Sequence, residues 1–82
     1  MIEKTFILNS NMDARAAAHF VQSASNFKAS VYIRAGGSML NAKSIMGMMA
    51  IGILEGQEVT IVVDGIDEED AIADLAKFFT QL

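Results

Sequence analysis

Cysteine and proline are both absent from this chain of 82 residues, and histidine occurs once. Without cysteine the protein has neither a disulfide framework nor thiolate chemistry, which is compatible with a reducing cytosol. A single histidine argues against a metal cluster, so we expect neither a metal site nor a cofactor. Low-complexity tracts and internal repeats are absent too, so nothing indicates a linker, and we expect one domain over residues 1–82.

Long apolar runs are missing as well. No stretch approaches the roughly 20 apolar residues that cross a bilayer, and the first residues lack the basic region and apolar run of a signal peptide. The net charge is −4, and six of the ten acidic residues lie between Asp64 and Asp74, where a phosphate backbone would be repelled. We therefore expect a soluble, cytoplasmic protein that contacts neither membranes nor nucleic acid directly.

The spacing of apolar residues predicts seven elements. Period-two alternation predicts four strands, at Ile2–Leu8, Ser30–Arg34, Ser38–Leu40 and Glu58–Asp64. Gly36-Gly37 is typical of a hairpin turn between the second and third strands. Helical spacing predicts three helices, from Ala14 to about Phe27, from Ser44 onward, and after Asp67. The order βαββαβα predicts an α+β open-faced sandwich, in which three helices cover one face of a four-stranded antiparallel sheet.

Four consecutive acids, Asp67-Glu68-Glu69-Asp70, stand at the start of the last predicted helix. Acidic side chains in a first helical turn complement the partial positive charge of that end and can cap its free amides. Charge runs of this kind usually lie in solvent. We therefore interpret these four residues as a solvated helix start.

The stretch from Asn41 to Leu54 combines a helix-start residue with an unusually apolar sequence, Asn-Ala-Lys-Ser-Ile-Met-Gly-Met-Met-Ala-Ile-Gly-Ile-Leu. Ser44 is the expected N-cap, because its hydroxyl can accept a hydrogen bond from a free backbone N–H of the first turn. Lys43 places a positive charge beside it, so a phosphate on the hydroxyl would be partly compensated there. We expect Gly52 or Gly56 to end this region.

The residues after Ser44 are apolar on every side at helical spacing. A small domain cannot bury such a helix completely, so we expect some of Ile45, Met46 and Met49 to be exposed and to form a docking patch. Methionine suits that role because it is flexible and polarizable. The alternative interpretation is a capped, buried core helix, since apolar stripes usually belong to the core.

The segment Asn-Ala-Lys-Ser-Ile-Met-Gly-Met-Met resembles the regulatory-serine segment of the HPr family, the phosphocarriers of the bacterial sugar phosphotransferase system, and of its catabolite-repression branch, Crh. The resemblance extends over nearly the whole chain and implies the fold predicted above. It also implies that a bifunctional HPr kinase/phosphorylase phosphorylates Ser44 from ATP. By position, the docking surface of the family falls on Ile45, Met46 and Met49.

The family's second signature is altered in this chain. In the family, Gly-Ile-His-Ala-Arg-Pro-Ala carries the histidine that passes a phosphoryl group from enzyme I to sugar transporters, whereas residues 11–17 here are Asn-Met-Asp-Ala-Arg-Ala-Ala. Asp13 replaces the histidine and Ala16 replaces the proline. A carboxylate can form an acyl phosphate, but a partner site shaped for imidazole would not place it for attack. We therefore expect ordinary phosphocarrier activity to be lost.

Asp13 has two interpretations. As a helix N-cap it would stabilise the protein by about 0.5–2 kcal/mol relative to alanine. Alternatively, its fixed negative charge imitates the family's phosphohistidine. Arg15 matches the family's arginine and would pair with Asp13, contributing at most about 1 kcal/mol at a surface, or contact an acidic partner. His19 lies too far along the helix to replace the histidine, and we expect a half-exposed residue without a catalytic role.

The leading hypothesis is a regulatory protein without enzymatic activity. By its resemblance to Crh, Ser44 phosphorylation would let it dock to a LacI-type regulator in carbon catabolite regulation, because the phosphate changes the charge beside the apolar patch. The residues expected to contact partners are Asp13, Arg15, Lys43, Ile45, Met46 and Met49.

Two other hypotheses stay open. One is phosphoryl transfer from phosphoenolpyruvate through enzyme I, with Asp13 or His19 as acceptor. The other is a docking module whose binding does not depend on Ser44. The apolar patch, together with a first strand followed by a short loop, would also suit a homodimer formed by strand exchange.

Overall fold

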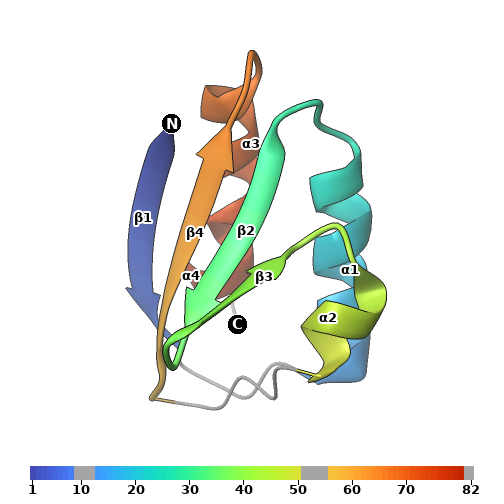
Figure 1. The fold of residues 1–82 in the computed structure, drawn as a ribbon, viewed down its shortest axis with the longest axis vertical. Coiled ribbons are helices and arrows are strands. Elements are labelled where there is room, and N and C mark those ends of the chain that lie inside the picture. Colours follow the sequence, from blue (N-terminus) through green and yellow to red (C-terminus); the bar gives the residue numbers. More distant parts are fainter. Residues whose placement is uncertain (9–12, 51–55, 81–82) are drawn as a thin grey trace.

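The computed structural model describes residues 1–8, 13–50 and 56–80, apart from the side chains of residues 49, 50 and 80. These residues form a four-stranded antiparallel sheet with helices on one face, which confirms the predicted α+β open-faced sandwich (Figure 1). The strands, in chain order, are β1 (Ile2–Ile7), β2 (Ser30–Ala35), β3 (Ser38–Asn41) and β4 (Glu58–Asp64). Their order in the sheet is β1-β4-β2-β3, so β4 pairs with both β1 and β2.

The helical segments are α1 (Ala14–Ser25), α2 (Ile45–Ala50), α3 (Glu68–Leu75) and α4 (Lys77–Thr80). α3 and α4 together occupy the place of the last predicted helix, with Ala76 between them. α1 begins where the sequence predicts but ends two residues before Phe27, with Asn26 as its C-cap. Of the two glycines predicted to end the second helix, Gly52 lies outside the described residues, whereas Gly56 lies in a turn with φ +85°. Within the described part of the chain, every helix is too short or too polar to cross a membrane.

The hairpin between β2 and β3 has the turn that its two glycines predict. Ala35 pairs with Ser38, so Gly36 and Gly37 alone make the connection. Both glycines have positive φ, +57° and +83°, which is the backbone of the two-residue turns that match strand twist. β3 is thereby placed at an edge of the sheet, and its far end leads directly to Ser44.

The core lies between the sheet and the helices. Inward-facing residues of β2 and β4 alternate along each strand and are almost fully buried: Val31, Ile33 and Ala35, and Val59, Ile61 and Val63. Phe20 of α1 meets the rings of Phe78 and Phe79, with centroids 5.2 and 5.5 Å away. Phe79 also stacks on Phe6 of β1 at 5.7 Å. These rings join the first strand, the first helix and the last helical segment.

The outer face of the sheet is covered by its own side chains at the centre. Val62 and Thr60 of β4 point away from the helices, yet they are only 4% and 7% exposed. Arg34 of β2 forms an ion pair of 2.8 Å with Glu3 of β1, which joins the strands on either side of β4. Thr60 also shares a hydrogen bond of 2.9 Å with Thr5. Long side chains of the flanking strands therefore shield the central strand.

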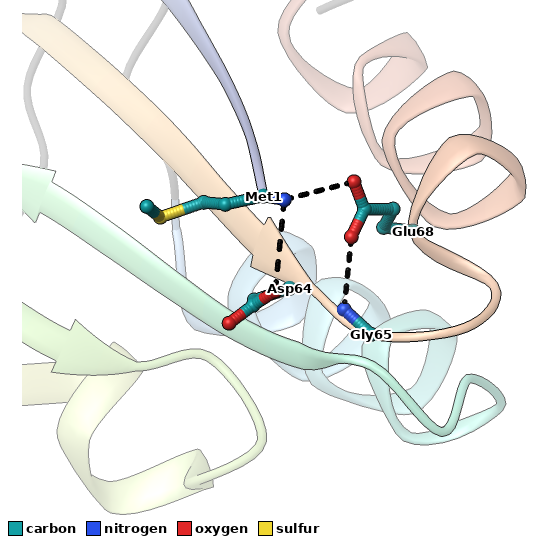
Figure 2. Close-up of polar contacts among 4 residues, drawn as sticks. All are labelled: Met1, Asp64, Gly65 and Glu68. Atoms are coloured by element: carbon teal, nitrogen blue, oxygen red, sulfur yellow. Dashed lines mark hydrogen bonds and ion pairs between the residues drawn. The ribbon is translucent and has the colours of Figure 1, made fainter.

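Glu68 connects the start of α3 to the start of β1 (Figure 2). Its Oε1 accepts a hydrogen bond of 3.1 Å from the Gly65 N–H, and its Oε2 lies 3.0 Å from the α-amino group of Met1, which is also 3.6 Å from Asp64. The Gly65 N–H and the Met1 ammonium hold the pKa of Glu68 below its usual value. In turn, the bond to Glu68 raises the pKa of the Met1 α-amino group.

Asp67 makes a second connection, to the turn between α1 and β2. Its two carboxylate oxygens accept hydrogen bonds of 2.8 Å from the backbone N–H groups of Lys28 and Ala29. Its side chain makes no capping bond to α3. The four acids at the start of α3 are exposed or half-buried, as the sequence predicts. What the sequence did not predict is that the carboxylates of Asp67 and Glu68 also bind backbone amides of turns outside α3.

These bonds predict an acid-sensitive stability. The Lys28 N–H, more than any other group, lowers the pKa of Asp67 from its ordinary 3.8, and the pKa of Glu68 is lowered from 4.5. A lowered folded-state pKa gives stability that is complete above the ordinary value and is lost as the pH falls through the folded one. The urea midpoint is therefore expected to drop between about pH 5 and pH 3. Asp67→Asn should lower the midpoint at pH 7 and flatten this dependence.

The matched control for that prediction is Asp70→Asn, which removes an exposed carboxylate from the same first turn. It should leave both the neutral midpoint and the acid dependence close to those of the wild type. An acid dependence as steep in Asp67→Asn as in the wild type would contradict the role assigned to the Asp67 carboxylate.

Candidate functional site

Ser44 lies in a turn whose backbone is held at several points. Ala42, directly after β3, is fully buried and its N–H donates to Val31 O at 2.8 Å. Asn41 then accepts two bonds: its Oδ1 from the Lys43 N–H at 2.9 Å, and its carbonyl from the Ser44 N–H at 3.1 Å. Backbone hydrogen bonds and the hydrogen bond to the side-chain amide oxygen of Asn41 therefore fix the turn up to Ser44.

The Ser44 hydroxyl has the capping role that the sequence predicts. Its Oγ accepts a hydrogen bond of 3.3 Å from the Gly47 N–H, while its carbonyl accepts the first helical bond, from Met48 N at 3.0 Å. The side chain is exposed. A Cβ at Gly47 would lie 3.4 Å from the same Oγ, which is an ordinary van der Waals contact.

α2 is divided between core and surface. Met48 is 2% exposed and packs in the core, whereas Ile45 and Met46 are 40% and 80% exposed. This confirms the expectation that part of the apolar segment stays outside the core. Met49 belongs to α2, but its side chain lies outside the described part of the chain. The exposed apolar surface beside Ser44 therefore consists, as far as it is described, of Ile45 and Met46.

Asp13 stands at the start of α1 and caps it. Its Oδ1 accepts a hydrogen bond of 2.8 Å from the Ala16 N–H, which confirms its interpretation as N-cap. Arg15 and His19 are exposed on the same helix. Among the described residues, no ion pair or hydrogen bond joins Arg15 to Asp13, or either of them to Ser44. α1 and α2 nevertheless contact each other, so both segments belong to one side of the molecule (Figure 1).

The side chain of Lys43 forms a hydrogen bond within the protein. Its Nζ donates a hydrogen bond of 2.8 Å to the carbonyl of Phe27, in the turn between α1 and β2. The side chain is half-buried, unlike that of the next residue, Ser44. Its positive charge also contributes to the lowered pKa of Asp67, after the larger effect of the hydrogen bonds from Lys28 and Ala29. Three turns that are distant in sequence therefore meet around residues 27–29.

Ser44 and Asp13 cap helices and Ile45 and Met46 are exposed, as the sequence predicts. Phe27 and Asp67 were not predicted as neighbours of the Ser44 turn. The contact from Lys43 uses the backbone carbonyl of Phe27, and a carbonyl is present at every residue, so the identity of Phe27 carries no signal. The signal at Asp67 was an acid before a helix, which predicts a cap more readily than a bond to a remote turn. Among the described residues, no group of three His, Asp or Glu side chains could hold a metal ion.

Comparison with known proteins places this geometry in a family. The family model described as "PTS HPr component phosphorylation site" matches residues 2–81. "HPr-like protein Crh" of Bacillus subtilis (strain 168) is 42% identical over 71 residues, which cover 87% of this chain and 84% of that protein. The chain therefore belongs to the HPr family. It is an HPr-like protein of the phosphotransferase and catabolite-repression group, similar to Crh.

Solved structures agree with this assignment. The crystal structure of "HPr-C-His" from Thermoanaerobacter tengcongensis superposes with a TM-score of 0.88 at 37% identity, over 99% of this chain and 93% of that one. A crystal structure of Bacillus subtilis Crh, described as an intertwined dimer with a swapping domain, gives 0.78 at 40% identity, over 90% of this chain and 85% of that one. The fold that the resemblance implied is thus confirmed.

Proposed function

We propose that this chain is a single-domain, HPr-like regulatory protein, not an enzyme, which an HPr kinase phosphorylates on Ser44. The phosphorylated form docks to a LacI-type transcriptional regulator in carbon catabolite regulation. The observation that carries the proposal is the exposed hydroxyl of Ser44, held in a fixed turn beside an exposed apolar surface, in a chain 42% identical to Crh. Asp13, a helix cap at the position of the family's histidine, supports a regulatory role over phosphoryl transfer.

The proposed docking surface centres on Ile45 and Met46, with Met49 as its third apolar member and with Asp13, Arg15 and Lys43 as its charged members. A phosphate on Ser44 adds a charge of about −1.5 to −2 next to these apolar side chains. Basic groups on a regulator would pair with that charge while the apolar side chains fill a complementary pocket. A partner that requires the neutral serine would be rejected.

A second copy of this chain is a further proposed partner. The swapped dimer described for Crh supports this proposal. The position of β1 supports it too, because β1 is an edge strand and its partner in the described sheet is β4 alone. A strand held through one neighbour can be exchanged between copies without rearranging the remaining strands.

The test is the intact mass of the purified protein after incubation with ATP and an HPr kinase. The wild type should gain one phosphoryl group and Ser44→Ala should gain none. Ser38→Ala is the matched control, since Ser38 is an exposed serine on the neighbouring edge strand, and it should gain one group as the wild type does. Failure of the folded wild type to gain mass would contradict the proposal.

A second experiment compares the binding of the phosphorylated and the unmodified protein to a LacI-type regulator. The phosphorylated protein should bind at least tenfold more tightly than the unmodified one, which corresponds to about 1.4 kcal/mol. Equal binding by both forms would exclude phosphorylation control and would favour the docking module that does not depend on Ser44.

A further inference from the structure

Lys43 precedes the proposed phosphorylation site, and its ammonium group donates a hydrogen bond to another part of the same chain. The Nζ lies 2.8 Å from the carbonyl oxygen of Phe27, and the contact is partly buried. A charged donor on a neutral carbonyl makes a stronger hydrogen bond than two neutral groups do, and partial burial reduces competition from water. This bond ties the turn before Ser44 to the turn between α1 and β2.

The turn that receives Lys43 is itself held in place. Asp67 accepts the backbone N–H groups of Lys28 and Ala29 at 2.8 Å each, so the residues next to Phe27 are fixed from the other side. The Phe27 N–H donates to Ala24 O at 3.3 Å at the end of α1. The Phe27 carbonyl is therefore an anchor point on a rigid turn, not on a free loop.

The bonds beyond Lys43 lead directly to the hydroxyl. The Lys43 N–H and the Ser44 N–H both donate to Asn41, and the Ser44 Oγ accepts from Gly47. An anchor at the Lys43 side chain restricts the backbone of the residue that precedes Ser44. A reacting hydroxyl that is fixed in one geometry loses less freedom when a kinase binds it.

We propose that Lys43 is a positioning residue for Ser44: its ammonium group, bound to the Phe27 carbonyl, holds the Ser44 turn in the geometry that the kinase binds. The inference rests on the proposed function and assigns to Lys43 a role inside this chain in addition to any contact with a partner. The lysine would act through Ser44 and would not touch ATP or the transferred phosphoryl group.

The test combines amide hydrogen exchange of the protein alone with steady-state kinetics of its phosphorylation by an HPr kinase. Lys43→Met keeps most of the side-chain length and removes the donor, whereas Lys43→Arg keeps a cationic donor. Lys28→Met is the matched control, because it removes the same charge from an exposed lysine of the anchoring turn while the Lys28 backbone bond remains.

In Lys43→Met the Ser44 and Met48 amides should exchange about tenfold faster, and kcat/KM for phosphorylation should fall by a similar factor, as expected for loss of one hydrogen bond to a charged group. Lys43→Arg should restore most of both values, and Lys28→Met should change neither. Slower phosphorylation of Lys43→Met with unchanged amide exchange would overturn the proposal, since Lys43 would then act on the kinase directly. An equal loss in Lys28→Met would overturn it in favour of a general charge effect.

The two readouts separate this inference from the function on which it rests. A wild type that the kinase does not phosphorylate would contradict the proposed function, and exchange of the Ser44 and Met48 amides would still decide whether Lys43 holds the turn. Unchanged exchange in Lys43→Met would overturn the positioning role whatever the kinase does.

Discussion

Replacement of Phe20 by alanine is expected to lower the free energy of unfolding by about 3–5 kcal/mol. The Phe20 side chain is 0% exposed, and its ring contacts both Phe78 and Phe79. Alanine would remove the apolar contacts of the ring and leave a cavity that the surrounding elements fill only in part. Since small domains have a total stability of about 5–15 kcal/mol, this variant should unfold at far lower urea concentrations.

Urea unfolding followed by circular dichroism measures the effect. Phe20→Leu, which keeps most of the apolar volume, should lose about 1–1.5 kcal/mol and stay folded in buffer. Met46→Ala is the surface control, because Met46 is 80% exposed, and it should change stability by no more than about 0.5 kcal/mol. A Phe20→Ala variant that unfolds at the same urea concentration as Met46→Ala would refute the central position assigned to this ring.

Gly65→Ala should destabilise the protein by about 2–3 kcal/mol. The cause here is steric overlap, whereas Phe20→Ala destabilises by leaving a cavity. A Cβ on Gly65 would lie 2.5 Å from the Cα and 2.8 Å from the Cβ of Ala29. Ala29 is buried, and its N–H is bound to Asp67, so its backbone cannot yield without breaking that bond. The substitution should therefore also weaken the connection between Asp67 and the turn that anchors Lys43.

Thermal unfolding measured beside Gly47→Ala tests this prediction. At Gly47 the nearest atom to a new Cβ is Ser44 Oγ at 3.4 Å, an ordinary contact, and alanine favours a helix by roughly 0.5–1 kcal/mol. The two glycine substitutions should thus shift the melting temperature in opposite directions, downward for Gly65 and slightly upward for Gly47. A Gly65→Ala melting temperature equal to that of the wild type would show that the two turns can move apart.

The elements themselves could be predicted from local patterns. The alternation in Glu58–Asp64 gave β4 with its observed bounds, and Asp13 and Ser44 marked helix starts because short polar side chains cap free amides. Gly36-Gly37 predicted the hairpin for an equally local reason. Each of these features depends on residues within a few positions of one another, which is why the sequence was sufficient.

The contacts around the Ser44 turn could not be predicted in the same way. The bonds from Lys43 to Phe27 and from Lys28 to Asp67 join residues 16 and 39 positions apart, and each uses a backbone group at one end. Backbone groups do not differ with residue type, so no pattern of side chains predicts such a hydrogen bond. Asp67 stands where a helix cap is expected, but its carboxylate accepts hydrogen bonds from the backbone amides of the α1–β2 turn instead.

The strand order β1-β4-β2-β3 has a consequence for synthesis on the ribosome. β1 is translated before its partner β4, which is the last of the described strands and ends at Asp64. At about 5–20 residues per second, roughly 3–11 s separate the translation of Ile7 from that of Asp64. The β2–β3 hairpin can form as soon as both of its strands have been made, whereas β1 has no strand partner until β4 has been made. In the proposed homodimer, β1 would pair with the β4 of a second chain, and this interval is when its own β4 does not yet compete.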